Sequence, residues 1–269
     1  MTTNLMAQGA SRLGLETKIY FRAPDTLFFT FFFPFVMLAI FTAAFSASGE
    51  VGPPGNEISI GALYLPGMIA AGILLSGVQN LAIDIALEKS NGTLKRLGGT
   101  PLSPVGYFLG KIGQVFVTGG LQAALLILAG WLVLGIDLPT DPAKWLTFAW
   151  VFVLGLTTCA LLGIALSALP RSGKSASAVV IPVVLLLQFI SGVYLQWDML
   201  PEWLQNIASL FPLKWIAQGM RSVFLPDGWE AAEQGGTWNL AGVAIALGIW
   251  LVVGFVLSRL TFRWIRRDA

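Results

Sequence analysis

Histidine is absent from the 269 residues, cysteine occurs once, as Cys159, and only 11% of the residues are charged. Without histidine or a second cysteine, the chain cannot form an internal disulfide or a histidine-based metal site. Its charged fraction is well below the roughly 25% of ordinary soluble domains, whereas 56% of its residues are hydrophobic. The composition therefore excludes a large soluble domain and indicates an integral membrane protein.

Hydrophobic runs long enough to cross a bilayer occur six times. A spanning helix needs about 20 mostly apolar residues, and the runs cover residues 27–46, 59–83, 112–135, 147–169, 178–196 and 238–260. We therefore expect an all-α membrane protein with six transmembrane helices, forming a single domain over residues 1–269. The first 25 residues lack the apolar core and cleavage site of a signal peptide, so we expect them to stay attached.

Basic residues are unevenly distributed over the predicted loops. With both termini inside, thirteen of the 16 lysines and arginines fall on the cytoplasmic side, and only Lys144, Lys214 and Arg221 fall outside. Lysine and arginine concentrate in cytoplasmic loops. The sequence therefore predicts a multi-pass protein of a bacterial inner membrane with both termini in the cytoplasm.

Three segments outside the spans have patterns of their own. Residues 1–25 alternate apolar and charged side chains before Pro24, which predicts an amphipathic helix on the cytoplasmic interface. Residues 84–111 are too polar to span and too long for a plain turn, which predicts a cytoplasmic helix where a partner docks. Residues 197–236 contain short apolar stretches interrupted by prolines, which predicts short external re-entrant helices buried against protein.

Residues 168–175, with the sequence ALPRSGKS, fit a relaxed phosphate-loop pattern. A phosphate loop joins a buried strand to a helix, but this stretch joins two hydrophobic spans. We interpret it as a short basic loop in which Ser175 or Ser177 caps the fifth span. We expect no catalytic residue and no cofactor bound by this chain.

The cores of the six predicted spans contain polar side chains but no charged ones. Interhelical hydrogen bonding is their main expected role. The alternative is a substrate path, with the amides of Gln79, Asn80 and Gln188 as neutral hydrogen-bonding groups and with Phe32 and Phe189 in an apolar wall. The phenylalanines of the first span could equally face lipid. Because the spans hold no proton relay, the sequence argues against a gradient-driven transporter or channel.

A set of short motifs resembles a known family. Glu88, Gly92-Thr93-Leu94, Leu97 and Thr100-Pro101-Leu102-Ser103 are similar to the cytoplasmic signature of ABC transporter type-2 permeases, which include the daunorubicin-resistance group. Further pieces follow in the family's order over most of the chain: Ser191-Gly192-Val193, Leu200-Pro201-Glu202-Trp203-Leu204, Phe211-Pro212-Leu213 and Arg221. The chain departs from the pattern at Ser90-Asn91 and at Gly98-Gly99.

The resemblance implies a permease subunit of an ATP-driven exporter. Such a subunit pairs with a second copy or a close homologue, and with two copies of a separate ABC ATP-binding subunit that carries the ATP and Mg; no nucleic acid is expected. The partner-coupling residues would be Glu88, Gly92, Thr93, Leu94, Lys95, Arg96, Thr100 and Pro101. Of these, we expect Glu88, Lys95 and Arg96 to be available to the partner.

An aromatic, uncharged path favours a hydrophobic or amphipathic small molecule, such as a drug or a lipid, as the exported substrate. Two alternatives remain open at the level of sequence. The chain could serve a polysaccharide or another polar substrate, or it could be a membrane scaffold that transports nothing.

Overall fold

The computed structural model describes residues 5–45, 47, 49–170 and 172–262. Four arginines that entered the orientation prediction lie outside the described residues, namely Arg171, Arg263, Arg266 and Arg267, as do residues 1–4 of the predicted interfacial helix. In the described part, the chain is a bundle of helices, and its extended pairing is an isolated bridge between Val51 and Ile58. The all-α prediction is confirmed.

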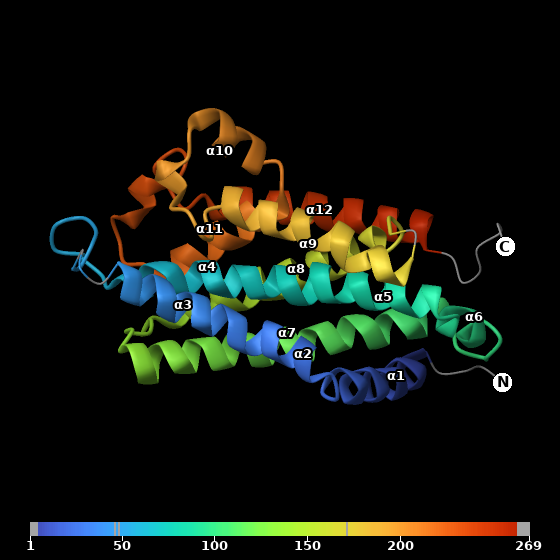
Figure 1. Cartoon of the computed structure of the whole chain (residues 1–269). Helices are drawn as coiled ribbons and strands as arrows, with labels where there is room; N and C mark the ends of the chain where they lie inside the picture. The colour runs from blue at the N-terminus through green and yellow to red at the C-terminus, as the bar shows by residue number, and fades with distance from the viewer. Residues whose placement is uncertain (1–4, 46, 48, 171, 263–269) are drawn as a thin grey trace.

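Six helices of the described chain are long and apolar enough to cross a membrane, which confirms the predicted number (Figure 1). The first two spans are continuous but contain a π-helical segment each. They consist of α2 (Pro24–Leu27), η1 (Phe28–Phe32) and α3 (Phe33–Ala44), and of α4 (Ile60–Leu74), η3 (Leu75–Asn80) and α5 (Leu81–Ser90). The remaining spans are α7 (Pro104–Leu134), α8 (Pro142–Leu166), α9 (Gly173–Ile190) and α12 (Leu240–Thr261).

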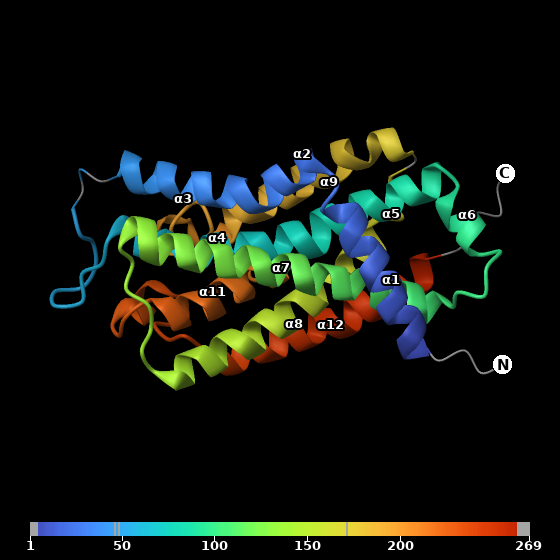
Figure 2. The same ribbon diagram turned by 90° about the horizontal axis from the view of Figure 1, so that it is seen from below.

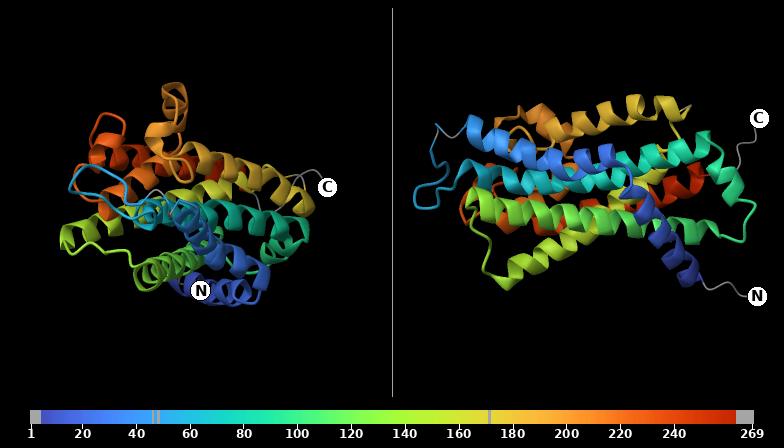
Figure 3. Two further views of the ribbon diagram at one scale, coloured as in Figure 1. Left: turned by 60° about the vertical axis from the view of Figure 1, so that its left-hand side comes forward. Right: turned by 60° about the horizontal axis from the view of Figure 1, so that its bottom comes forward.

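Short helices gather at the two ends of the bundle. At one end lie α1 (Leu5–Tyr20), which crosses the bundle obliquely and packs on α7, and α6 (Thr93–Leu97) (Figures 1 and 3). At the other end, the segment between the last two spans forms η4 (Trp197–Met199), α10 (Glu202–Ala208), α11 (Pro212–Phe224) and η5 (Trp229–Ala232). This end matches the expectation of short helices, and α11 is almost wholly buried against α4, α8 and α12.

Local sequence explains where several spans begin and end. Ser103 caps α7 by accepting a hydrogen bond from the Gly106 amide at 3.0 Å, and Pro104 follows as the first helical residue. This is the arrangement that helix N-termini favour. Gly135 ends α7 in the left-handed conformation, with φ of 63°, which glycine adopts without steric cost.

The cap of α9 differs from the prediction. Ser172 is the capping residue: its hydroxyl accepts from the Ser175 amide at 3.3 Å, and the Ser175 hydroxyl accepts from the Ser172 amide at 3.1 Å. The prediction that Ser175 or Ser177 caps this span was wrong because the helix begins earlier. Ser175 instead completes a reciprocal capping box with Ser172.

The second and third spans are longer than the hydrophobic runs that predicted them. Residues 84–90 and 104–111 continue these helices, so only residues 91–103 connect them. Each span then has 31 residues, or about 46 Å of helix, against about 30 Å of hydrocarbon. Hydropathy underestimated their length because the additional turns carry charged side chains, which bond to one another within the bundle.

The second span is the centre of the bundle. Its first part, α4, is buried over most of its length and packs on α3, α7 and α11. Its π-helical part, η3, packs on α8 at two glycines, where a Cβ added to Gly163 would lie 2.2 Å from the Gly77 carbonyl oxygen. Backbones in membranes approach this closely only at small residues. In Figure 2, α3 and α9 lie on one side of this central helix and α8 and α12 lie on the other.

Candidate functional site

A groove of about 550 Å³ lies between the first, second and fifth spans. We call it the amide groove, because the three amide side chains predicted to face a substrate path, Gln79, Asn80 and Gln188, all line it. Its other lining residues come from the same helices and are mostly apolar: Phe29, Phe33, Leu75, Ile83, Leu87, Ile181, Val184 and Leu185, together with Asp25, Thr26, Thr30, Asp84 and Ser177.

The three amides are engaged to different degrees. The Asn80 side chain donates to the Thr30 hydroxyl at 2.9 Å and to the Tyr20 hydroxyl at 3.3 Å, and Tyr20 donates to Thr30 at 2.6 Å. Asn80 thus fastens α1 and the first span to the second span, next to both π-helical segments. Gln188, by contrast, is only 2% exposed, and its amide nitrogen has no partner among the described residues. A buried amide donor without a partner is costly, and it is available to a ligand in the groove.

The two phenylalanines of the predicted path do not line the groove. Phe32 and Phe189 are 50% and 44% exposed, on η1 and α9, at the outer surface of the same helices. The groove instead includes two carboxylates, since Asp25 and Asp84 line it. The expectation of an entirely uncharged wall is therefore wrong for this groove.

A cluster of charged side chains lies where α1, α5 and α7 meet. This charged cluster consists of Arg12, Glu16, Asp84, Glu88 and Lys111, and Tyr107 adds a hydroxyl. The Lys111 ammonium donates to Glu16 at 2.8 Å, to Glu88 at 3.0 Å and to Asp84. Arg12 pairs with Glu16 and donates to Glu88 at 3.1 Å. The cluster therefore ties the first helix of the chain to the second and third spans.

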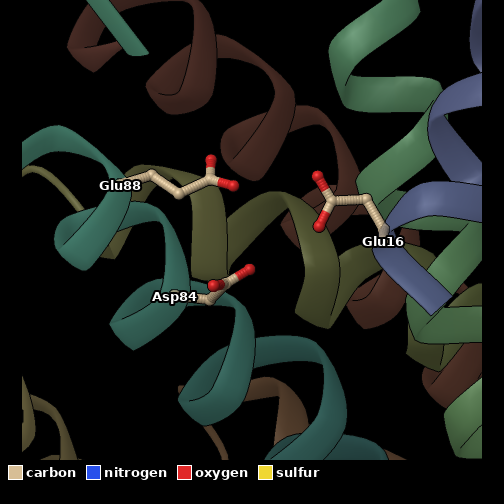
Figure 4. Close-up of side chains that lie close together, drawn as sticks. All are labelled: Glu16, Asp84 and Glu88. Atoms are coloured by element: carbon tan, nitrogen blue, oxygen red, sulfur yellow. The ribbon is translucent and has the colours of Figure 1, made fainter. Parts of the chain in front are cut away.

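The three carboxylates converge from two helices, Glu16 from α1 and Asp84 and Glu88 from α5, as Figure 4 shows. Their oxygens lie close enough to one another to share a metal ion. The Lys111 ammonium, however, bonds to an oxygen of each of them, and it thereby provides the central cation. The geometry is that of a lysine enclosed by carboxylates.

Burial governs the electrostatics of the charged cluster. Lys111 has no exposed surface, and Glu16 is 3% exposed. Burial raises the pKa of Glu16 above 4.5, while the Lys111 ammonium acts in the opposite direction. Three carboxylates face two cations here, so the cluster carries one more negative than positive charge when every group is ionised. Each cation is therefore needed to stabilise the buried carboxylates.

Glu88 was expected to be available to a cytoplasmic partner, and the structure corrects this. Its side chain points into the bundle, where its two oxygens accept hydrogen bonds from Arg12, Lys111 and, at 2.6 Å, Tyr107. The reason is that Glu88 follows Asp84 by one helical turn, so both carboxylates face α7 and its lysine. Glu88 holds α5 in place and presents little surface to another protein.

The remaining predicted coupling residues surround α6. Gly92 takes the left-handed conformation, with φ of 77°, between α5 and α6, and the Asn91 side chain caps the Thr93 amide at 3.0 Å. Leu94 is 2% exposed and anchors the short helix to the core, whereas Lys95 and Arg96 are exposed.

The loop after α6 is held to α1. The Thr100 hydroxyl donates to the Leu97 carbonyl at 2.7 Å, and the Pro101 carbonyl accepts from the Gln8 side chain at 3.1 Å. The α6 region is thus fixed to the bundle by its apolar face and its loop, with its cations directed outward.

Sequence reasoning missed Arg12, Glu16, Tyr107 and Lys111 as members of a site. A signal was present, since Arg12 and Glu16, like Asp84 and Glu88, are four residues apart and therefore share a helix face. That spacing shows which charges lie together on one helix. It contains no information on which other helix they meet.

A second buried charged group lies at the opposite end of the bundle. Arg221 pairs with Glu233 and donates to the Gly192 carbonyl at 3.0 Å, which joins α11 to the end of the fifth span. Lys214 is 1% exposed, and its ammonium lies 4.1 Å from the centroid of the Trp215 ring. Burial lowers the pKa of Lys214 to about 8.

Comparisons with known proteins show which family the chain resembles. The model of the family described as ABC-2 family transporter protein matches residues 53–260. The chain is 26% identical over 255 residues to ycf38 of Cyanophora paradoxa, whose name describes a transport permease; the match covers 93% of this chain and 84% of that protein. It is 22% identical over 214 residues to YbhR of Escherichia coli strain K12, named a probable multidrug ABC transporter permease, with 74% and 56% covered.

A third relative comes from Bacillus subtilis strain 168. It is the linearmycin resistance permease protein LnrN, which is 27% identical over 169 residues, with 63% of this chain and 43% of that protein covered.

Proposed function

Because the chain belongs to the ABC-2 family of transporters, we propose that it is the permease subunit of an ATP-driven exporter. It carries a hydrophobic or amphipathic small molecule out of the cytoplasm or the inner leaflet. Two copies of a separate ABC ATP-binding subunit, with their ATP and Mg, supply the energy. The permease lies in a bacterial inner membrane with both termini in the cytoplasm, as the distribution of its basic residues favours.

The amide groove is the observation that carries the proposed substrate class. Its walls combine phenylalanine, leucine and isoleucine side chains with the amides of Gln79 and Gln188, and two carboxylates, Asp25 and Asp84, also line it. An apolar body and a few polar groups of a ligand would both be matched there. The printed names of YbhR and LnrN, which mention multidrug transport and linearmycin resistance, favour a drug-like substrate.

A second copy would complete the path. The groove lies between the first and fifth spans, whose outer surfaces expose Phe28, Phe29, Phe32 and Phe189. A partner permease placed against this surface would cover the phenylalanines and enclose the groove between two subunits. The predicted role of Phe32 and Phe189 in the path then belongs to the assembled dimer.

Energy enters through α6 in this proposal. Lys95 and Arg96 are exposed on α6, and Leu94 anchors this helix to the core. An ATP-binding subunit docked on the two cations could therefore move α6 as a rigid unit. The motion would pass through α5 to the charged cluster, where Glu88 and Asp84 are bonded to α1 and α7. Glu88 would thus take part in coupling from inside the permease.

The test is ATP-dependent transport by inverted membrane vesicles that contain the permease and its copurified partner. We expect accumulation of a fluorescent amphipathic dye that requires ATP, and its loss when Lys95 and Arg96 are both changed to Glu, with the permease still inserted. The matched control is Lys174→Glu, which reverses an exposed cation at the start of α9. This control should transport normally.

Three outcomes would contradict the proposal. Dye accumulation that persists without ATP and stops on adding an uncoupler would identify a gradient-driven transporter. Absence of both transport and a copurified ATP-binding protein would favour a scaffold. Normal transport by the Lys95→Glu, Arg96→Glu variant would exclude α6 as the coupling contact.

A further inference from the structure

A second groove lies on the other side of the central helix from the amide groove. It has a volume of about 480 Å³ and is lined by residues of α7, α8 and α12. Figure 2 shows α8 and α12 on the opposite side of the central helix from α3 and α9. We call it the lipid-side groove. Its walls are apolar and include Phe108 and Leu109 of α7, Leu161 of α8, and Leu251 and Phe255 of α12.

The two hydroxyl groups in these walls are both engaged. Thr157 donates to the Val153 carbonyl at 2.7 Å, and Ser258 donates to the Phe255 carbonyl at 2.9 Å, so each bonds to its own helix. Along its length, the lipid-side groove therefore offers hydrocarbon and aromatic surface to an occupant.

Packing keeps the groove open in this half of the bundle. Gly254 lets α12 approach α8, because a Cβ added there would lie 3.0 Å from the Leu161 Cβ. Phe262, just after α12, packs against Phe108 of α7, with their ring centroids 4.5 Å apart. The three helices are thus fastened around the groove without filling it.

One cation lines the groove. Arg259, in the last turn of α12, is exposed, and its guanidinium lies 5.1 Å from the centroid of the Phe255 ring. Among the described residues, it pairs with no carboxylate. In the part of the chain that the structure describes, the α1 end of the bundle thus presents a cation without a carboxylate partner beside an apolar channel. With α12 placed across a membrane, its last turn would lie at the level of the lipid phosphates.

We infer that the lipid-side groove binds an anionic phospholipid, with one acyl chain between α7, α8 and α12 and the phosphate on Arg259. Basic pockets between spans on the cytoplasmic side bind anionic headgroups, and an arginine binds phosphate oxygens through two parallel N–H groups. A lipid matches both halves of the site, the channel and the charge. With the orientation proposed above, it comes from the cytoplasmic leaflet; binding itself requires neither transport nor the partner.

Native mass spectrometry of the purified permease, titrated separately with phosphatidylglycerol and phosphatidylcholine, tests this inference. We expect the wild type to bind phosphatidylglycerol more tightly than phosphatidylcholine. In Arg259→Gln, the affinity for phosphatidylglycerol should fall about fivefold. Arg259→Lys should recover most of the preference, and Lys174→Gln, which removes an exposed cation away from the groove, should leave it unchanged. Leu161→Trp, which fills the channel, should weaken binding of both lipids, in protein whose melting temperature shows that it is folded.

Unchanged phosphatidylglycerol binding in Arg259→Gln would overturn the headgroup contact, and equal losses in Arg259→Gln and Lys174→Gln would show nonspecific attraction.

The other possible occupant is a second copy of the chain. In membranes, a disulfide-linked dimer of Val252→Cys, at an exposed groove residue, would show that this face is a subunit interface and would overturn the lipid site. The native Cys159 is fully buried, so it gives little background.

Discussion

Among the described residues, Lys111 makes the largest number of ion pairs. It is fully buried, and it bonds to three carboxylates contributed by α1 and α5. A charged lysine is tolerated at such a position only because those carboxylates replace the water it has lost. Glu16, Asp84 and Glu88 depend on the lysine in the same way. The packing of α1 against the second and third spans therefore depends on the charge of Lys111.

We predict that Lys111→Met lowers the free energy of unfolding by about 3–5 kcal/mol, because it leaves the buried carboxylates of Glu16 and Glu88 with a single paired cation, Arg12. Chemical unfolding in detergent micelles measures the change. A loss below about 1 kcal/mol would show that the carboxylates are hydrated or protonated in the folded protein.

Glu16→Gln is the matched control within the same cluster. The amide still accepts a hydrogen bond from Lys111, and the surplus negative charge is removed, so we expect unchanged or higher stability. The pKa of Glu16 is raised above 4.5 in the folded state, so folding favours proton binding. Between pH 4.5 and that raised pKa, the contribution of Glu16 to stability declines as the pH rises. The Gln variant should lack this decline.

In the described chain, the backbones of α8 and the second span approach each other closely at Gly77 and Gly163. Small residues bring the two backbones together, so dispersion contacts replace the hydrophobic effect that cannot drive helix association in lipid. The η3 segment, which contains Gly77, departs from regular α-helix, and such π-helical turns often occur at functional sites. Here Asn80, at the end of η3, bonds to Thr30 in η1, so the two irregular segments are joined.

We predict that Gly163→Ala destabilises the protein by about 1–3 kcal/mol. The added methyl would lie 2.2 Å from the Gly77 carbonyl oxygen, a backbone atom that cannot rotate away. Gly120→Ala, in the middle of α7 with nothing within 4 Å of its added methyl, is the control and should be neutral or stabilising. Melting temperatures of both variants in one detergent decide the matter. Equal values would mean that α8 can shift at no cost.

For the molecule as a whole, the two ends of the bundle have different chemistry. One end carries α1, α6 and the charged cluster, and the other carries α10 and α11. At this second end, Lys214 lies against Trp197 and Trp215, and Arg221 pairs with Glu233. Two faces differ as well: the amide groove is lined by the first span and α9, and the lipid-side groove by α8 and α12. Figure 2 shows these two pairs of helices on opposite sides of the second span. We expect one face to meet a second permease and the other to meet lipid.

The orientation proposed for the protein predicts which end meets the outside. A cysteine in place of Asp227, an exposed residue of the loop after α11, should react with a membrane-impermeant maleimide in intact cells. A cysteine in place of Lys95 should react only after the inner membrane is made permeable. The reverse pattern would invert the topology and would place α6 away from the cytoplasmic ATP.

The sequence by itself determined the class of this protein, its six spans and the end of the bundle at which most basic residues gather. These properties depend on hydrophobicity and charge added up over neighbouring residues, and a helix enters a bilayer when about 20 consecutive residues are mostly apolar. The start of α7 at Ser103 and Pro104 also has a local signal, a capping serine followed by proline, although hydropathy placed this start at residue 112. The order of the family motifs was likewise readable along the chain, and the match to the family agrees with it.

Only the tertiary structure decided which groups meet. Lys111 and Glu16 are 95 residues apart in sequence, and Arg12 and Glu88 are 76 apart. No periodicity encodes such a pairing, because it depends on how α1 folds back across α7. For the same reason, Glu88 turned out to face inward, and the amide groove acquired Asp25 and Asp84. A charged side chain raises the polarity of its own segment wherever it occurs, but its role depends on whether the folded chain places a counterion beside it.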